Sequence, residues 1–250
     1  MLLDIQHLFK AFDGVRAVND VCLSIREGTV TSITGPNGAG KTTLFNLIEG
    51  FLRQDSGRVS YKGKQIDGMR PSQRALLGIG RVWQDIRLFK RMTVEENLLV
   101  AKKNHPGDSV INCLFRYRTV SRMEKDNSNS AERILEFIKL GHKRRSLAQD
   151  LSYGQQKLLS LGRLLSNEAE LLLVDEPTAG VSPVMVDEIL TLIRSLATQG
   201  KTILMIEHNV PRAKSISDHV YVMNRGRVER SAHNSDLSVH HAQGEVCAGI

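Results

Sequence analysis

Short apolar runs rich in β-branched and aliphatic residues recur along the chain and predict buried strands. They occupy 29–34, 171–176, 202–208 and 219–224 and read TVTSIT, LLLVDE, TILMIEH and HVYVMN. Their nearly continuous apolar character is typical of strands in a sheet that is covered on both faces. Segments with helical spacing separate the runs, as in TTLFNLIEG and VMVDEILTLIRSLATQG, where Gly200 provides a stop. This order of elements predicts an α/β fold.

Two other regions have different patterns. The beginning of the chain carries turn signals and shorter strand-like stretches, LLDIQHLFKAF, VRAVNDVCLSI and GRVSYKG, which predict a small antiparallel sheet. A helical pattern dominates from TVEENLLVAKK to SAERILEFIKLG and predicts a helical subdomain, in which polar stretches at 104–110 and 124–130 are expected to be loops. The predicted organisation is one domain, 1–250, with a core from 1–84 and 161–250 and an inserted helical subdomain at 85–160.

Composition and charge limit the classes of protein to which the chain can belong. A chain of 250 residues with 41% apolar content can bury a sizeable core. No apolar run exceeds four residues, and the start MLLDIQHLFK does not have the pattern of a signal peptide, so we expect a cytoplasmic protein without a membrane span. The net charge of +7 includes the clusters RLFKRM and HKRR. Without a recognition motif we interpret them as solvated faces and expect no nucleic-acid partner.

The stretch GPNGAGKTT carries the strongest chemical signal. It matches G-x-x-x-x-G-K-[ST] from Gly35 to Thr42, directly after an apolar strand and before a helix. The glycines allow the backbone N–H groups to face phosphate, Lys41 reaches the β- and γ-phosphates, and the Thr42 hydroxyl binds Mg²⁺. The predicted nucleotide contacts are Gly35, Pro36, Asn37, Gly38, Ala39, Gly40, Lys41, Thr42 and Thr43.

An acidic pair ends the apolar run LLLVDEP. Asp175 suits Mg²⁺ bound through water, and Glu176 suits a catalytic base that polarises the attacking water. Alone, such a pair before Pro177 could simply end a strand, but the phosphate loop favours the functional interpretation. These two motifs do not separate a nucleotide kinase from a helicase or a mechanical ATPase.

The stretch LSYGQQK, at 151–157, has two interpretations. Ser152 and Gln155 have the spacing of a capping box, which satisfies the first N–H groups of a helix. An exposed helix N-terminus with Gly154 beside it could also bind an anion, such as a nucleotide held by another molecule.

GPNGAGKTT, Gln84 in RVWQDIRLF, LSYGQQK, DEPTAGVSP and His208 in IEHNV follow one another over essentially the whole chain. Together they resemble the motifs of the ATP-binding-cassette family. The resemblance implies a P-loop NTPase core with a small antiparallel β subdomain, an inserted helical subdomain, and Mg²⁺-dependent ATP hydrolysis. It also implies that two cassettes enclose two ATP molecules, each contacted by the other subunit's signature residues Ser152, Tyr153, Gly154 and Gln155.

The same resemblance implies roles for three further residues. Phe12 would stack on adenine, although a core phenylalanine is the alternative. Gln84 would contact Mg²⁺ or the attacking water and link the site to the helical subdomain. His208 would hold the γ-phosphate and, with Glu176 and Gln84, complete the catalytic set.

Within the family, SYGQQ, AGVSP, MTVEENLLVA and IEHNV are most similar to ATPase subunits of branched-chain amino acid importers, and urea or amide importers share much of this pattern. The implied partners are a second cassette subunit, transmembrane permease subunits and, indirectly, a periplasmic or extracellular solute-binding protein. The chain would then lie at the cytoplasmic side of the membrane. Ser182 replaces an Asn of the family pattern, and the tail after Arg230 is polar. The alternative is a soluble cassette ATPase that remodels a cytosolic assembly, as in iron–sulfur cluster biogenesis.

Overall fold

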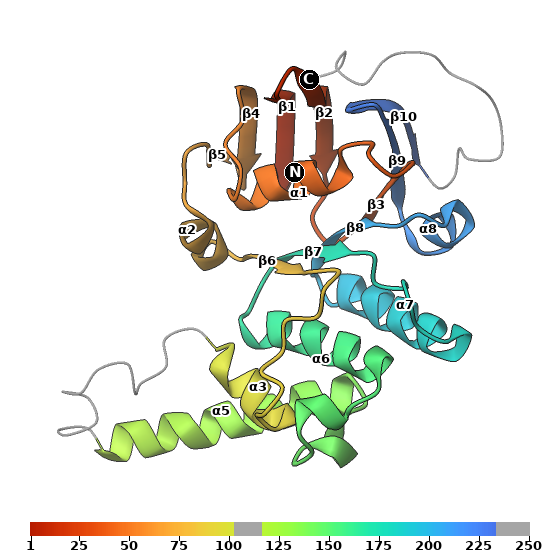
Figure 1. Cartoon of the computed structure of the whole chain (residues 1–250). Helices are drawn as coiled ribbons and strands as arrows, with labels where there is room; N and C mark the ends of the chain where they lie inside the picture. The colour runs from red at the N-terminus through yellow and green to blue at the C-terminus, as the bar shows by residue number, and fades with distance from the viewer. Residues whose placement is uncertain (103–116, 234–250) are drawn as a thin grey trace. The chain divides into compact units, whose positions relative to one another are not determined.

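The chain divides into two units in the computed structural model, which describes residues 1–102 and 117–233 (Figure 1). The core unit comprises Met1–Gln84, Glu170–Ala179 and Val186–Ile250, and the helical unit comprises Asp85–Ala169 and Gly180–Met185. The expected boundary at 160 falls inside helix α6, because α6 runs over Tyr153–Ser166. The predicted loop at 104–110 and most of the polar tail lie outside the described residues.

The larger sheet belongs to the core unit and has the strand order β10-β9-β3-β8-β7-β6. Adjacent strands in this order pair in parallel from β9 to β6, and β10 is antiparallel to β9. The bounds are β3 Val30–Thr34, β6 Ile79–Val82, β7 Leu171–Asp175, β8 Thr202–Ile206, β9 His219–Asn224 and β10 Arg227–His233. Every residue of β3, β7 and β8 is buried, which confirms the expectation from their continuous apolar runs.

The smaller sheet of the core unit is antiparallel, as predicted, with the order β2-β1-β4-β5. Its strands are β1 Leu3–Phe12, β2 Val15–Ile25, β4 Ser56–Tyr61 and β5 Lys64–Gln65. The expectation of shorter strands is wrong for β1 and β2, which have 10 and 11 residues. Register shifts between them interrupt the alternation that would have revealed their length, and His7 and Asp20 have positive φ angles of 47° and 58°.

Four helices have most or all of their residues in the core unit: α1 Lys41–Glu49, α2 Pro71–Leu76, α7 Pro183–Thr198 and α8 Val210–Ile216. Helix α1 begins directly after the phosphate loop and buries Leu44, Phe45, Leu47 and Ile48. These side chains join one hydrophobic cluster with residues from both sheets, including Leu3 of β1 and Leu204 of β8. Packing therefore fixes α1, and the loop before it, against the core.

The helical unit contains α3 Val94–Val100, α5 Tyr117–Phe137, the 3₁₀ turns η2 Gly141–Lys143 and η3 Ala148–Asp150, and α6. The predicted loop at 124–130 is wrong, because this stretch continues α5. Its polar composition reflects exposure, since Glu124, Lys125 and Asp126 all face solvent. Within the described residues, no helix is both long and apolar enough to cross a membrane.

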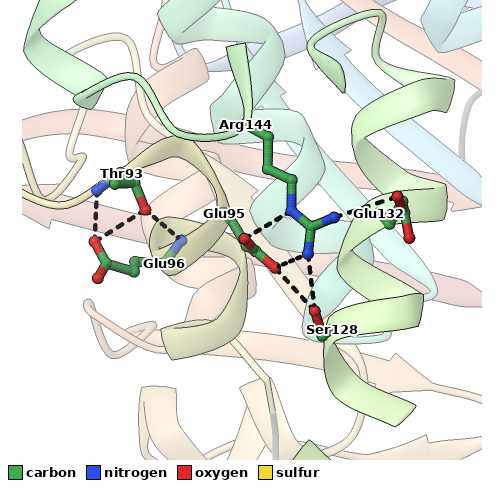
Figure 2. Close-up of polar contacts among 6 residues, drawn as sticks. All are labelled: Thr93, Glu95, Glu96, Ser128, Glu132 and Arg144. Atoms are coloured by element: carbon green, nitrogen blue, oxygen red, sulfur yellow. Dashed lines mark hydrogen bonds and ion pairs between the residues drawn. The ribbon is translucent and has the colours of Figure 1, made fainter. Parts of the chain in front are cut away.

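Arg144 ties the elements of the helical unit together (Figure 2). Its Nε and Nη2 donate to the two carboxylate oxygens of Glu95, at 2.7 and 2.6 Å. Nη2 also donates to Ser128 Oγ at 3.0 Å, and Nη1 to Glu132 Oε1 at 3.2 Å. Glu95 lies in the first turn of α3, whereas Ser128 and Glu132 belong to α5. One guanidinium thus joins α3 to α5 through charge-assisted hydrogen bonds.

Candidate functional site

One edge of the larger sheet brings the predicted site residues together. The neighbouring parallel strands β3, β8, β7 and β6 all end at this edge, because parallel strands share one direction. The phosphate loop follows β3, His208 follows β8, Glu176 follows β7, and Gln84 follows β6. Ligands of α/β folds bind at such carboxyl ends.

The phosphate loop requires glycine at both of its ends. Gly35 and Gly40 have φ angles of 147° and 101°, which side chains disfavour. A Cβ atom at Gly35 would lie 2.0 Å from the carbonyl oxygen of Met223, and one at Gly40 would lie 2.1 Å from that of Ala17. Gly40 is also the N-cap of α1 and supplies no side-chain cap. The first N–H groups of α1 are therefore suited to an anionic ligand.

A pocket of about 190 Å³ opens at the start of α1. It is lined by Ala17, Asn37, Gly38, Ala39, Gly40, Lys41, Thr42, Thr43, Glu176 and His208. The structure thus places seven of the predicted phosphate-loop residues and two of the predicted catalytic residues around one cavity. Ala17, from β2, also lines it, and nothing in its own sequence context indicated a site residue.

Lys41 is largely buried and lines this pocket. Its Nζ donates to the carbonyl oxygens of Gly35 and Pro36, each at 2.8 Å. The pKa of Lys41 lies below its ordinary value, because the effect of burial exceeds the opposing effect of the negative charges of Glu176 and Asp175. The amine is thus held across the loop by neutral acceptors.

Glu176 lies between two predicted partners from neighbouring strand ends. Its Oε2 accepts a hydrogen bond from Gln84 Nε2 at 3.0 Å, and its Oε1 lies 2.5 Å from His208 Nε2. The backbone of Glu176 has φ 49°, a left-handed conformation that is uncommon outside glycine and occurs often at functional sites. The carboxylate is therefore fixed through both oxygens at the wall of the phosphate pocket.

Asp175 is buried, and its Oδ2 accepts a hydrogen bond from Arg81 Nη2 at 2.5 Å. Arg81 was not predicted from the sequence; the available signal is a cation between the apolar residues Ile79 and Val82, three residues before Gln84. The residues predicted to hold Mg²⁺ have the ligand chemistry that a hard cation requires, because Thr42, Gln84 and Asp175 offer hydroxyl, amide and carboxylate oxygens.

Phe12 is not among the residues that line the pocket. It ends β1 and is 42% exposed, so the alternative of a core phenylalanine is wrong. Lys10 Nζ lies 5.3 Å from the centroid of its ring. The ring is accessible for stacking, and its predicted contact with adenine stays a prediction.

The signature residues lie in the helical unit and form the predicted cap. Ser152 is the N-cap of α6: its side chain accepts from Gln155 N at 3.3 Å, and Gln155 Oε1 accepts from Ser152 N at 3.1 Å. Gly154 leaves no room for a side chain, because a Cβ atom there would lie 2.9 Å from the Met185 side chain. Ser152 and Tyr153 are exposed, so the helix start is open to a ligand.

Comparisons with known proteins agree with this geometry. The family model described as "ABC transporter" matches residues 18–179, more than half of the chain. The chain is 39% identical over 240 residues to "Probable branched-chain amino acid transport ATP-binding protein LivG" of Archaeoglobus fulgidus, covering 94% of this chain and 91% of that one. It is 38% identical over 226 residues to BraF of Pseudomonas aeruginosa, named "High-affinity branched-chain amino acid transport ATP-binding protein", covering 90% of this chain and 89% of that protein.

A solved structure shows the same fold at a similar level of identity. It is the ADP conformation of an ATP-binding cassette of an ABC transporter, with a TM-score of 0.82 and 37% sequence identity, covering 95% of this chain and 93% of that one. The predicted α/β P-loop NTPase core, with its antiparallel β subdomain and helical subdomain, is thereby confirmed. With this fold, the family match and the relatives together, the chain belongs to the ABC transporter family, among its ATP-hydrolysing subunits.

Proposed function

We propose that this chain powers an importer of branched-chain amino acids, or of a related small amide or urea solute, from the cytoplasmic side of the membrane. The observation that carries the proposal is the fixed position of Glu176 at the phosphate pocket, between Gln84 and His208. The names of LivG and BraF support the solute class. They do not favour the alternative of a soluble remodelling ATPase.

In the proposed mechanism, the loop and Lys41 bind the β- and γ-phosphates of ATP at the N-terminus of α1. Thr42, Gln84 and Asp175 would hold Mg²⁺, with Asp175 acting through a water ligand. Bound Mg²⁺ would supply charge neutralisation at the phosphates.

Glu176 is the proposed general base. Its carboxylate accepts hydrogen bonds and can take the proton of a water aimed at the γ-phosphorus. Gln84 and His208 fix its orientation, one on each oxygen, and His208 also lines the pocket where a γ-phosphate would lie. Precise placement of this kind lowers the entropic barrier to an in-line reaction.

The remaining assignments concern assembly. In the proposed dimer, which could be a homodimer or a heterodimer, Ser152 to Gln155 of one subunit cover the nucleotide of the other. ATP closes the dimer, hydrolysis reopens it, and separate permease subunits receive the movement. The cassette acts as one domain with a core and a helical subdomain. The exposed N-terminus of α6 supports the trans contact.

Affinity purification from membranes in a mild detergent tests the transporter proposal. We expect partners with many apolar membrane spans to copurify, and ATP-driven uptake of leucine or valine after reconstitution with a solute-binding protein. Recovery of soluble partners alone would overturn the transporter proposal, and uptake of only other solutes would overturn the solute class.

A further inference from the structure

A buried arginine, Arg81, connects the carboxylate of Asp175 to helix α1. Arg81 is the third residue of β6, and its side chain is only 1% exposed. Its Nη2 donates to Asp175 Oδ2 at 2.5 Å. Its Nη1 donates to Asn46 Oδ1 and to Glu49 Oε2, each at 2.8 Å. Asn46 and Glu49 belong to α1, the helix that begins at Lys41.

Aromatic rings also hold the guanidinium. Its central carbon lies 4.0 Å from the centroid of the Trp83 ring and 5.3 Å from that of Phe45. Arginine suits such a place because its planar fork can pair with two acceptors while its face stacks on an aromatic ring. Polar contacts and packing together therefore fix the orientation of Arg81.

Stability alone is a poor reason for this arrangement. Two buried charges lose their hydration, and well-packed apolar residues often replace a buried ion pair without loss of stability. Arg81 Nε, moreover, is buried and has no hydrogen-bond partner in the part of the chain that the structure describes. A buried donor without a partner is unfavourable, so this atom adds no hydrogen-bond energy to the stability of the cluster.

The place of Arg81 along β6 suggests a functional explanation. Val82 pairs with Val174, so β6 runs beside β7 up to the acidic pair. Arg81 contacts Asp175, and Gln84, three residues later, contacts Glu176. One strand end thus holds both carboxylates that the proposed function assigns to the metal and to the attacking water.

The second consequence concerns Lys41. Lys41 Nζ bonds to two carbonyl oxygens of its own loop, whereas Asp175 is hydrogen-bonded to Arg81. Asp175 and Glu176 both act electrostatically on Lys41. Asp175 thus pairs with Arg81 while Lys41 is held by its own loop, so the two groups have separate partners.

We propose that Arg81 is a positioning residue for divalent-cation binding: it orients Asp175 relative to the helix that carries Lys41 and Thr42. This inference rests on the proposed function of the site. The contact uses one carboxylate oxygen of Asp175, which leaves the other for a water ligand of the cation. Arg81 needs to touch neither the nucleotide nor the cation to have this effect.

Two variants that keep the net charge of the cluster test the proposal. Arg81→Met combined with Glu49→Gln removes one positive and one negative charge, so a changed affinity reports position rather than net charge. Arg81→Lys keeps the charge but loses the planar fork, and it is the more conservative change if the double variant fails to fold. Arg74→Met is the matched control, because Arg74 is also buried and donates to α1, through the carbonyl oxygens of Leu47 and Ile48.

The measurements are ADP binding by calorimetry in EDTA and Mn²⁺ binding by electron paramagnetic resonance with saturating ADP. We expect the double variant to weaken Mn²⁺ binding by about tenfold or more, and Arg81→Lys by a smaller factor. Arg74→Met should leave Mn²⁺ binding unchanged, and all variants should bind ADP in EDTA with similar affinity. Mn²⁺ affinities within about threefold of wild type in the folded variants would overturn the positioning role. Absence of Mn²⁺–ADP binding in the wild-type chain would instead contradict the proposed function.

Discussion

Glu176 shows how single residues are prepared for chemistry at this site. Its backbone is left-handed, with φ 49°, and Gln84 and His208 hold the two carboxylate oxygens. Such a conformation persists only where the surroundings enforce it. Here the bond from Glu176 N to the carbonyl oxygen of Ile206, at 3.1 Å, contributes to that enforcement.

Replacing Glu176 by Gln should therefore separate binding from chemistry. The amide keeps the shape of the side chain but cannot take a proton, and loss of a general base costs roughly 10² to 10⁴ in rate. Lys41 and the loop remain to bind ATP, so single-turnover hydrolysis should slow while ATP affinity is retained. In size-exclusion chromatography, the variant should form a dimer with Mg-ATP but not with Mg-ADP. Hydrolysis at the wild-type rate would reject Glu176 as the base.

At the scale of elements, a polar network joins two helices of the helical unit. Arg144 bonds to both oxygens of Glu95, and these bonds lower the pKa of Glu95 below 4.5 (Figure 2). The unfolded chain then binds more protons than the folded chain at acid pH. The stabilisation from this pair is present above the ordinary pKa of glutamate and is lost as the pH falls through the lowered pKa.

Arg144→Met should accordingly reduce stability in a pH-dependent way. We expect a loss of about 1 kcal/mol at neutral pH, after allowance for the partial exposure of the pair. The difference from wild type should shrink as the pH falls from 4.5 through the lowered pKa of Glu95, because Glu95 becomes protonated in both states. Urea unfolding across this range measures it, with Arg133→Met as an exposed control on α5. A difference that stays constant with pH would contradict this account.

The same scale shows what sequence could and could not predict. Strands β3, β7, β8 and β9 were predictable, because each is short and rich in β-branched or aliphatic residues. Strand β6 was missed, since Gly80 and Arg81 break its apolar pattern, and α5 was partly missed because its exposed face is polar. In the site, the phosphate loop and the acidic pair were readable as local motifs. The contact between Arg81 and Asp175 joins distant segments and left no such motif.

At the scale of the whole molecule, the helix start at the signature motif can be compared with a second helix start, that of α3. Ser152 and Thr93 are both N-caps with capping boxes, at α6 and α3. Changing either residue to Ala should cost about 1 kcal/mol of stability. Only Ser152→Ala should also lower ATP hydrolysis, because only Ser152 is assigned to the nucleotide of the partner. Equal hydrolysis by the two variants, measured below their unfolding transitions, would leave Ser152 with the capping role alone.

Mixed dimers test the trans contact directly. When Ser152→Arg subunits are mixed with Lys41→Ala subunits, one composite site of the heterodimer carries both changes and the other carries neither. Activity of the mixture should thus exceed the sum of the separate variants. If verified heterodimers show no such gain, the trans assignment fails.

Transmission of force to the permease is expected to begin next to Gln84. The stretch QDIRLFKRM leads from Gln84 into exposed residues, including Arg87 and the 45% exposed Phe89. Arg87→Glu combined with Leu88→Asp should abolish transport in reconstituted vesicles while ATP binding by the isolated subunit stays nearly unchanged. Retained transport would reject this route.

Trp83 gives this chain a built-in optical signal. It is the only tryptophan among the 250 residues, and it lies against the Arg81 guanidinium and edge-on to Phe51, with ring centroids 5.3 Å apart. Indole emission responds to charges and polarity near the ring, and here the Arg81 guanidinium, which pairs with Asp175, lies 4.0 Å from the ring centroid. Fluorescence of the unlabelled protein, excited at wavelengths where tyrosine does not absorb, therefore originates from a single place next to Arg81, and its spectrum needs no correction for other tryptophans.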